Sequence, residues 1–154
     1  LPHLRWQPSD LAGNLPGVRL WLAEAGLPNV AEPRVLDVHQ ADWGPETYDG
    51  VFSANTAHIL DWFGVSALFQ GVGRVLEPGG VFALYGPFSY GGEHTSESNA
   101  RFDAFLKSRD PGSGVRDLDD LRPVAASAGL ALERDFPMPA NNRTLVWRRS
   151  DLRW

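Results

Sequence analysis

Short apolar segments alternate with segments of helical periodicity along most of the chain, and this alternation constrains the fold more than any other feature. Strands that alternate with helices are typical of a largely parallel sheet with helices on both faces. The sequence therefore predicts an α/β fold. The expected strands are residues 4–8, 34–38, 48–55 and 81–88, and the expected helices are residues 16–25, 65–76, 97–109 and 117–128.

The C-terminal part of the pattern differs, because two strand-like segments follow each other with no helix between them. Residues 130–136 and 143–149 flank the sequence MPANN, which is typical of a turn. We expect an antiparallel hairpin at an edge of the sheet. Residues 77–80, EPGG, are expected to form a turn, and the nearly continuous apolar run 81–88 predicts a strand buried on both faces.

The composition indicates one globular domain over residues 1–154. Hydrophobic residues make up 43% and charged residues 21% of the chain, which is enough for a core and argues against disorder. The net charge of −5 disfavours nucleic acid as a partner, since such binding needs a basic surface. With no cysteine and 4 histidines, no metal site is expected. No apolar run reaches the ~18 residues of a membrane span, so we expect no membrane contact and a cytoplasmic location.

Ligands of an open parallel sheet bind beyond the carboxyl ends of its strands. Asp10 follows the first expected strand, where a carboxylate can accept hydrogen bonds from ribose hydroxyls or else cap the next helix or stabilise a turn. Asp37 follows the second strand, where it can accept from an adenine amine or cap its own loop. Its neighbours Val38 and Asp42 are alternatives for the adenine contact.

A glycine-rich phosphate cradle is not visible. Neither GxGxxG nor GxGxG occurs, and the glycine-rich stretch GVGRVLEPGG lies where a helix is expected to end. The pattern therefore disfavours an NAD(P) dehydrogenase, which also needs a Tyr-x-x-x-Lys pair that the chain does not contain.

Several later motifs resemble those of the class I S-adenosylmethionine-dependent methyltransferases, which have a Rossmann-like sheet. The segment RVLEPGGVFALYGPF is similar to the half of that fold that follows the cofactor loop. More closely, the chain resembles the family that includes methyltransferase-like protein 26. The motifs that carry this resemblance are WQPSD, FSANxxHI, LEPGGxFxLYGPF, TSxSNxxFD, RDPxxGxRD and MPANN.

The resemblance implies S-adenosylmethionine as the cofactor. It assigns Asp10 to the ribose hydroxyls, Asp37 and Val38 to the adenine, and Asn55 to the methionine end. It also implies that the first strand and the glycine-rich loop of the fold would precede Leu1. They are expected to lie upstream of the sequence or to be lost. The chain departs from the family pattern at Thr56–Ala57 and at Asp61.

Other polar side chains are candidates for catalysis or substrate binding. His58 is a candidate general base, since imidazole titrates near pH 6.5, or else a structural histidine before the next helix. His94, a candidate substrate contact, lies in a glycine-rich loop that could form a lid, and the favoured alternative is a solvent-exposed loop residue. Tyr85, Arg116, Asn141 and Asn142 are candidate substrate contacts. For Tyr85 core packing is the favoured alternative, for the two asparagines it is a hairpin turn, and Arg116 would clamp an anionic group.

These features predict methyl transfer to a small-molecule acceptor that the sequence does not name. The alternative is a non-catalytic scaffold with a methyltransferase-like fold, which the missing glycine loop would explain. The oligomeric state is left open, with a homodimer as one expectation.

Overall fold

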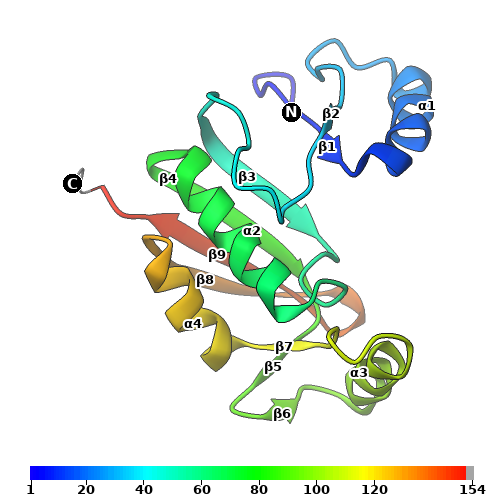
Figure 1. The fold of residues 1–154 in the computed structure, drawn as a ribbon, viewed down its shortest axis with the longest axis vertical. Helices are drawn as coiled ribbons and strands as arrows, with labels where there is room; N and C mark the ends of the chain where they lie inside the picture. Colours follow the sequence, from blue (N-terminus) through cyan, green and yellow to red (C-terminus); the bar gives the residue numbers. More distant parts are fainter. Residues whose placement is uncertain (152–154) are drawn as a thin grey trace. The chain divides into compact units, whose positions relative to one another are not determined.

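A computed structural model describes residues 1–151 of the chain and divides it into two compact units, Leu1–Trp43 and Gly44–Trp154. Figure 1 shows the helices and strands of both units. The chain has the mixed α/β architecture expected from the alternating pattern. Each unit is described by itself.

The first unit contains two short parallel strands joined through a helix. Strand β1 (Ser9–Asp10) leads through a 3₁₀ turn, η1 (Ala12–Asn14), into helix α1 (Leu15–Ala25), and strand β2 (Arg34–Val35) pairs with β1. Pro16 lies in the first turn of α1, and the helix ends at Gly26, whose φ of 59° suits glycine.

Both strands of this unit are shorter than expected and one is displaced. The strand predicted at residues 4–8 is instead a single bridge from Trp6 to Val30 followed by β1 at Ser9–Asp10. Proline has no N–H to donate, so Pro8 cannot extend the ladder as a donor. The strand predicted at residues 34–38 stops at Val35, because Asp37 begins a turn in which its carbonyl accepts from the Gln40 amide.

The second unit has a four-stranded sheet of order β3-β4-β9-β8. Strands β3 (Tyr48–Ala54) and β4 (Leu76–Gly86) are parallel, and helix α2 (Trp62–Val75) connects them. The C-terminal hairpin is formed by β8 (Leu130–Met138) and β9 (Asn142–Arg149), with a short 3₁₀ turn, η2 (Pro139–Asn141), between them. Strand β9 is antiparallel to both neighbours, so β3, β4 and β8 run in one direction.

The remaining elements lie between β4 and the hairpin in the sequence. A second sheet of three short strands has the order β6-β5-β7, with β5 at Phe88–Tyr90, β6 at Glu93–His94 and β7 at Arg116–Asp117. Helix α3 (Glu97–Arg109) follows β6 and has the bounds predicted from its periodicity. Helix α4 (Leu118–Ser127) leads into β8.

Helices α2 and α4 pack against each other and cover one face of the four-stranded sheet (Figure 1). The core lies beneath them, where the ring of Phe69 contacts those of Phe82 and Trp147 edge to face at 5.5 and 5.3 Å. Helix α2 begins three residues before the predicted position because the Asp61 carboxylate accepts from the Gly64 amide and caps it.

The opposite face of this sheet is more exposed than predicted. Along β4, buried residues alternate with half-buried ones, so the strand is not fully buried on both faces. Phe52 and Phe136 lie on the more open face and are 55% and 45% exposed. The prediction that the apolar run 81–88 forms a strand buried on both faces was therefore wrong. The EPGG segment, predicted to be a separate turn, lies within β4 instead, but the register shifts there: Tyr48 pairs with Leu76, and the next pair joins Gly50 to Val81.

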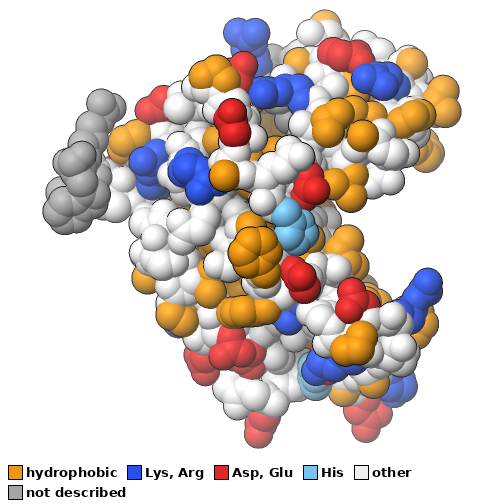
Figure 2. All heavy atoms as spheres, in the orientation of Figure 1, with side chains coloured by type: hydrophobic (Ala, Val, Ile, Leu, Met, Phe, Trp, Pro, Cys, Tyr) orange, Lys and Arg blue, Asp and Glu red, His pale blue; other side chains and the backbone are white. Residues whose placement is uncertain are grey.

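On the face drawn in Figure 2, acidic and basic side chains are interspersed with apolar ones. Within residues 1–151, none of the helices has the combined length and hydropathy that a bilayer crossing requires.

Candidate functional site

Asp10 and Asp37 of the first unit follow adjacent parallel strands at the same edge. Asp10 ends β1, and Asp37 comes two residues after the end of β2. The strands are in register here, since Asp10 pairs with Val35 and its carbonyl accepts from the Leu36 amide at 2.8 Å. The pair is thus placed as the sequence predicted, at the carboxyl ends of neighbouring strands.

Both carboxylates also have local partners. Oδ1 of Asp10 accepts from the Leu11 amide and from Nδ2 of Asn14, at 2.7 and 2.9 Å. Oδ1 of Asp37 accepts from the His39 amide at 3.0 Å, and this bond together with the His39 ring lowers the pKa of the Asp37 carboxyl. Val38 lies half-buried between Asp37 and His39. Asp10 caps neither η1 nor α1, so its contacts fit the turn alternative, and those of Asp37 fit the loop-capping alternative. They leave the second oxygen of Asp10 for a ligand.

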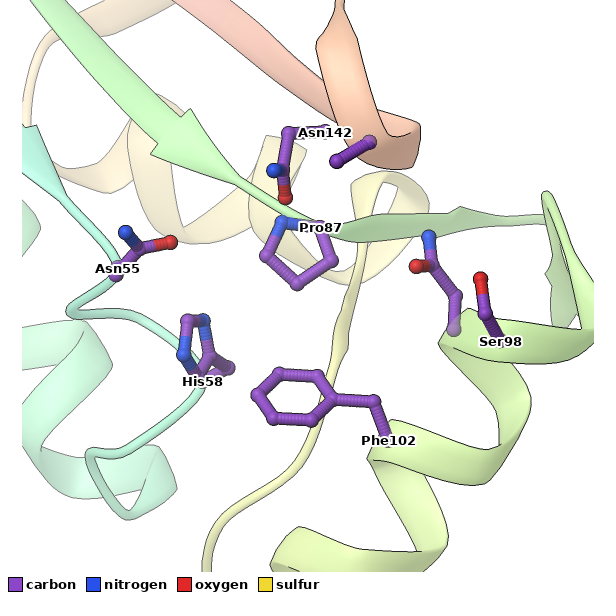
Figure 3. Close-up of a pocket in the computed structure, with 8 residues that line it drawn as sticks. Asn55, His58, Pro87, Ser98, Phe102 and Asn142 are labelled. Carbon is purple, nitrogen blue, oxygen red and sulfur yellow. The ribbon is translucent and has the colours of Figure 1, made fainter.

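In the second unit, an open pocket of about 380 Å³ lies where β3 and β4 end. Figure 3 shows Asn55 and His58 from the segment after β3, Pro87 from the end of β4, Ser98 and Phe102 from α3, and Asn142 from the start of β9. Asn99 and Ala140 complete the lining. Four segments that are distant in the sequence thus meet around one space.

His58 is the only ionisable side chain among these lining residues. It is 7% exposed, and its ring packs edge to face on Phe102 with 5.2 Å between centroids. Burial lowers the His58 pKa, and the positive charge of Arg116 lowers it further. The imidazole is therefore neutral near pH 7 and able to accept a proton.

The segment around Arg116 fixes the loop that carries His58. The Gly114 amide donates to the His58 carbonyl at 3.0 Å. The Arg116 guanidinium donates to the carbonyl oxygens of Ala57, Leu60 and Gly112 and lies 5.5 Å from the centre of the Trp62 ring. These contacts give Arg116 an internal role in the protein. Its predicted contact with a substrate anion stays a prediction.

The other predicted substrate contacts are divided between the pocket and its surroundings. Asn142 lines the pocket, and its Nδ2 is 3.1 Å from the hydroxyl of Tyr85. Asn141 lies directly behind the lining, where its carbonyl accepts from Asn99 and its side chain donates to Ser98. His94 is not part of the described lining. It belongs to β6, and its Nε2 is 3.5 Å from the Asp103 carboxylate.

Unusual backbone conformations gather at this pocket. Within residues 1–151, the non-glycine residues with positive φ are Asn55, Ala140 and Asn141, at 57°, 60° and 60°. Two of them line the pocket, and the third is bonded to its wall. Such conformations cost energy and are common at functional sites. The hairpin-turn alternative fits Asn141, which lies in η2 with a positive φ, whereas Asn142 is already the first residue of β9.

Sequence reasoning did not single out the wall that α3 provides. Ser98, Asn99 and Phe102 all belong to the motif TSxSNxxFD, which carried the resemblance but received no role. Ser98, Asn99 and Phe102 lie on one helix face because residues three and four apart are neighbours there. The spacing SNxxF was therefore the signal that could have identified this wall.

Comparison with solved structures places the fold among methyltransferases. An O-methyltransferase family protein from Burkholderia thailandensis matches with a TM-score of 0.85 and 18% identity, over 99% of this chain and 46% of its own. The mitomycin 7-O-methyltransferase MmcR matches with a TM-score of 0.84 and 19% identity, over 97% of this chain and 43% of its own.

The O-methyltransferase NcsB1 from neocarzinostatin biosynthesis, solved with S-adenosylmethionine and 2-hydroxy-5-methyl naphthoic acid, matches with a TM-score of 0.74 and 19% identity. This match covers 92% of the present chain and 40% of NcsB1. The chain thus spans less than half the length of these three proteins. At these identities the likeness establishes the fold, which is the Rossmann-like α/β fold of class I methyltransferases.

A family model matches residues 1–149, nearly the whole chain, and its description is "Protein of unknown function (DUF938)". The chain belongs to this family.

Proposed function

We propose that the protein transfers a methyl group from S-adenosylmethionine to a small-molecule acceptor. The observation that carries the proposal is the pocket at the ends of β3 and β4, where one buried, neutral histidine lies among uncharged polar side chains. The methyltransferase fold supports it, and so do two structural neighbours whose names include small molecules, the mitomycin 7-O-methyltransferase MmcR and NcsB1 with its naphthoic acid. The motifs further support a place in the family that includes methyltransferase-like protein 26.

We assign the nucleoside of the cofactor to the first unit. Asp10 would accept from the ribose hydroxyls, and Asp37 with Val38 would contact the adenine. The residues present fit this role, because two carboxylates follow adjacent parallel strands and Asp10 keeps one oxygen for a ligand. Asn55 is assigned to the methionine end of the cofactor.

We assign the acceptor and its proton to the second unit. S-adenosylmethionine would supply a methyl group on a positively charged sulfur: the nucleophile of the acceptor would bond to the methyl carbon, and S-adenosylhomocysteine would leave as the neutral thioether with the electrons of the broken S–C bond. His58 would hold the acceptor and take the proton that the nucleophile loses, and the neutral imidazole is the form that can do so. Phe102 and Pro87 would exclude water from one side of the acceptor.

The experiment that tests the proposal is calorimetric titration of the chain with S-adenosylmethionine and with S-adenosylhomocysteine. We expect heat and 1:1 binding for both compounds. If neither compound binds to the folded chain, the proposal is wrong for this chain and the scaffold alternative gains support. A positive result leads to a screen of uncharged hydroxylated compounds for methylation, followed by mass spectrometry.

A further inference from the structure

The carboxamide groups of the pocket in the second unit have a common orientation. Nδ2 of Asn99 donates to the Thr95 hydroxyl and to the Asn141 carbonyl, at 3.1 and 3.0 Å. A carbonyl oxygen only accepts, so this network identifies the nitrogen of the Asn99 side chain. Its carboxamide oxygen is the polar atom left to face the pocket that the residue lines.

Asn142 is oriented in the same way. Its Nδ2 donates to the Tyr85 hydroxyl at 3.1 Å and to the Pro139 carbonyl at 3.4 Å. The carboxamide oxygen of Asn142 is therefore also left for the pocket.

Asn55 contributes a third carboxamide oxygen. Its Oδ1 lies 3.9 Å from the position that a Cβ atom would take on Gly86, and Nδ1 of His58 lies 3.7 Å from the same position. Figure 3 shows the oxygen of Asn55 on the pocket side of its side chain. Because residue 86 is glycine, the space between these two polar atoms stays open.

None of the residues described as lining the pocket is Asp, Glu, Lys or Arg. Arg116, the cation whose charge acts on His58, is engaged with three carbonyl oxygens. The walls thus offer carbonyl-type acceptors, the hydroxyl of Ser98, the neutral imidazole of His58 and the apolar rings of Phe102 and Pro87. An anionic group would meet oxygen atoms of its own polarity without a cation in the lining to offset its desolvation.

We infer that this pocket selects an uncharged ring compound through at least two hydrogen-bond donors, and that it discriminates against carboxylates. The hydroxyl that reacts would lie between Asn55 and His58, and a second donor would reach Asn99 or Asn142. As a statement about the methyl acceptor, this inference rests on the proposed function. As a statement about ligand selectivity, it rests on the pocket alone.

The test is a titration of the chain by ligand-observed saturation-transfer NMR, without cofactor, using four probes. Catechol and trans-cyclohexane-1,2-diol each present two adjacent hydroxyls, on an aromatic and on a saturated ring. In 1,2-dimethoxybenzene the donors are removed, and in salicylate a carboxylate replaces one hydroxyl. We expect at least one diol to bind, and 1,2-dimethoxybenzene and salicylate to bind roughly 3- to 10-fold more weakly per donor lost.

Two variants test whether the preference for hydrogen-bond donors arises in this pocket. Asn142→Leu should weaken binding of the preferred diol by a similar factor and reduce its advantage over 1,2-dimethoxybenzene. Gln70→Leu is the matched control, since it removes a carboxamide that donates to Ser127 outside the pocket. It should change neither the affinity for the preferred diol nor the advantage of that diol over 1,2-dimethoxybenzene. The probe series on the unaltered chain needs no variant, so the test stands even if Asn142→Leu does not fold.

Each outcome decides the inference. Equal or tighter binding of 1,2-dimethoxybenzene or salicylate overturns it, and so does the absence of binding by both diols at millimolar concentrations. If one diol binds alone, the ring type is identified. Repeating the titration with S-adenosylhomocysteine separates the two proposals. If the pocket selects donors but S-adenosylhomocysteine does not bind, the inference about the pocket stands and the proposed methyl transfer is refuted. If S-adenosylhomocysteine binds but the pocket does not select donors, the inference about the pocket is refuted and the proposed methyl transfer stands.

Discussion

Two residues carry most of the proposed chemistry, and the local environment of each can be tested. Asp10 is bonded within its own turn, to the Leu11 amide and to Asn14, and it is also the candidate for the ribose hydroxyls. His58 is buried against Phe102, and its loop is held by Gly114 and Arg116. For each residue, a structural role and a functional role predict different changes in cofactor affinity or turnover when the residue is replaced.

Asp10→Ala should weaken the binding of S-adenosylhomocysteine by about 1–3 kcal/mol, the usual cost of leaving polar partners unsatisfied. Calorimetric titration measures this. Glu24→Ala, on the exposed surface of α1, is a control for the change in net charge. Asn14→Ala removes a hydrogen-bond partner of Asp10 but keeps the carboxylate, and should bind nearly as the unaltered chain does. An equal loss in Asn14→Ala would make the role of Asp10 structural.

His58→Ala should lower turnover and leave the affinity for S-adenosylhomocysteine unchanged, because the proposed proton acceptor contributes to the reaction and not to cofactor binding. The measurement is S-adenosylhomocysteine formation with any acceptor that the unaltered chain methylates, next to a calorimetric titration. Full turnover in the variant rules out the base role, and a parallel loss of cofactor affinity indicates a structural one.

The buried imidazole also predicts how stability depends on pH. Burial, and then the charge of Arg116, lowers the His58 pKa in the folded chain, so the unfolded chain binds this proton more readily. The contribution to stability is complete above pH 6.5 and is lost as the pH falls through the lowered pKa. Urea unfolding from pH 7.5 down to 5 should show this loss, and it should be smaller in His58→Asn. An NMR titration that gives a His58 pKa at or above 6.5 contradicts the prediction.

At the scale of elements, a glycine allows α2 to approach the end of α4 closely. A Cβ atom on Gly73 would lie 2.3 Å from the Ala128 carbonyl oxygen, which is part of the backbone and cannot easily move. By contrast, a Cβ on Gly17 in α1 would have no neighbour within 4 Å. The two glycines therefore differ in packing while sharing a helical backbone.

Gly73→Ala should destabilise the protein by roughly 1–3 kcal/mol through overpacking, although alanine is the better helix former. Gly17→Ala is the matched control and should stabilise by up to about 1 kcal/mol. Denaturant unfolding followed by circular dichroism measures both. A stabilising Gly73→Ala would show that α2 and α4 are not in close contact.

For the whole molecule, stability depends on the core between the four-stranded sheet and helices α2 and α4. Phe69 is fully buried, and its ring contacts Phe82 of β4 and Trp147 of β9. It therefore joins a helix to the two central strands, one of which comes from the C-terminal hairpin.

Phe69→Ala should cost about 3–5 kcal/mol, a large part of the roughly 5–15 kcal/mol by which domains are stable. Phe63→Ala on the same helix is the control. Its side chain is 68% exposed, so the cost should stay below about 1 kcal/mol. Thermal or urea unfolding checks both values, and similar costs for the two variants would contradict the packing described for α2.

The sequence by itself determined which segments form helices and which form the hairpin, because periodicity and turn residues act locally. Helix α3 and the pair β8–β9 appear where the pattern predicted them. The displaced β1, the shortened β2 and the open face of the sheet were not predicted, because proline positions and long-range pairing decide them.

Only the tertiary structure decided where β9 lies and which side chains form the pocket. The hairpin inserts β9 between β4 and β8, which brings Asn142 beside Tyr85, 57 residues away in the sequence, and Asn141 beside Asn99, 42 residues away. It also turned Arg116, a candidate ligand contact in the sequence, toward the loop of His58. Contacts at such separations depend on the packing of whole elements, and no local pattern specifies them.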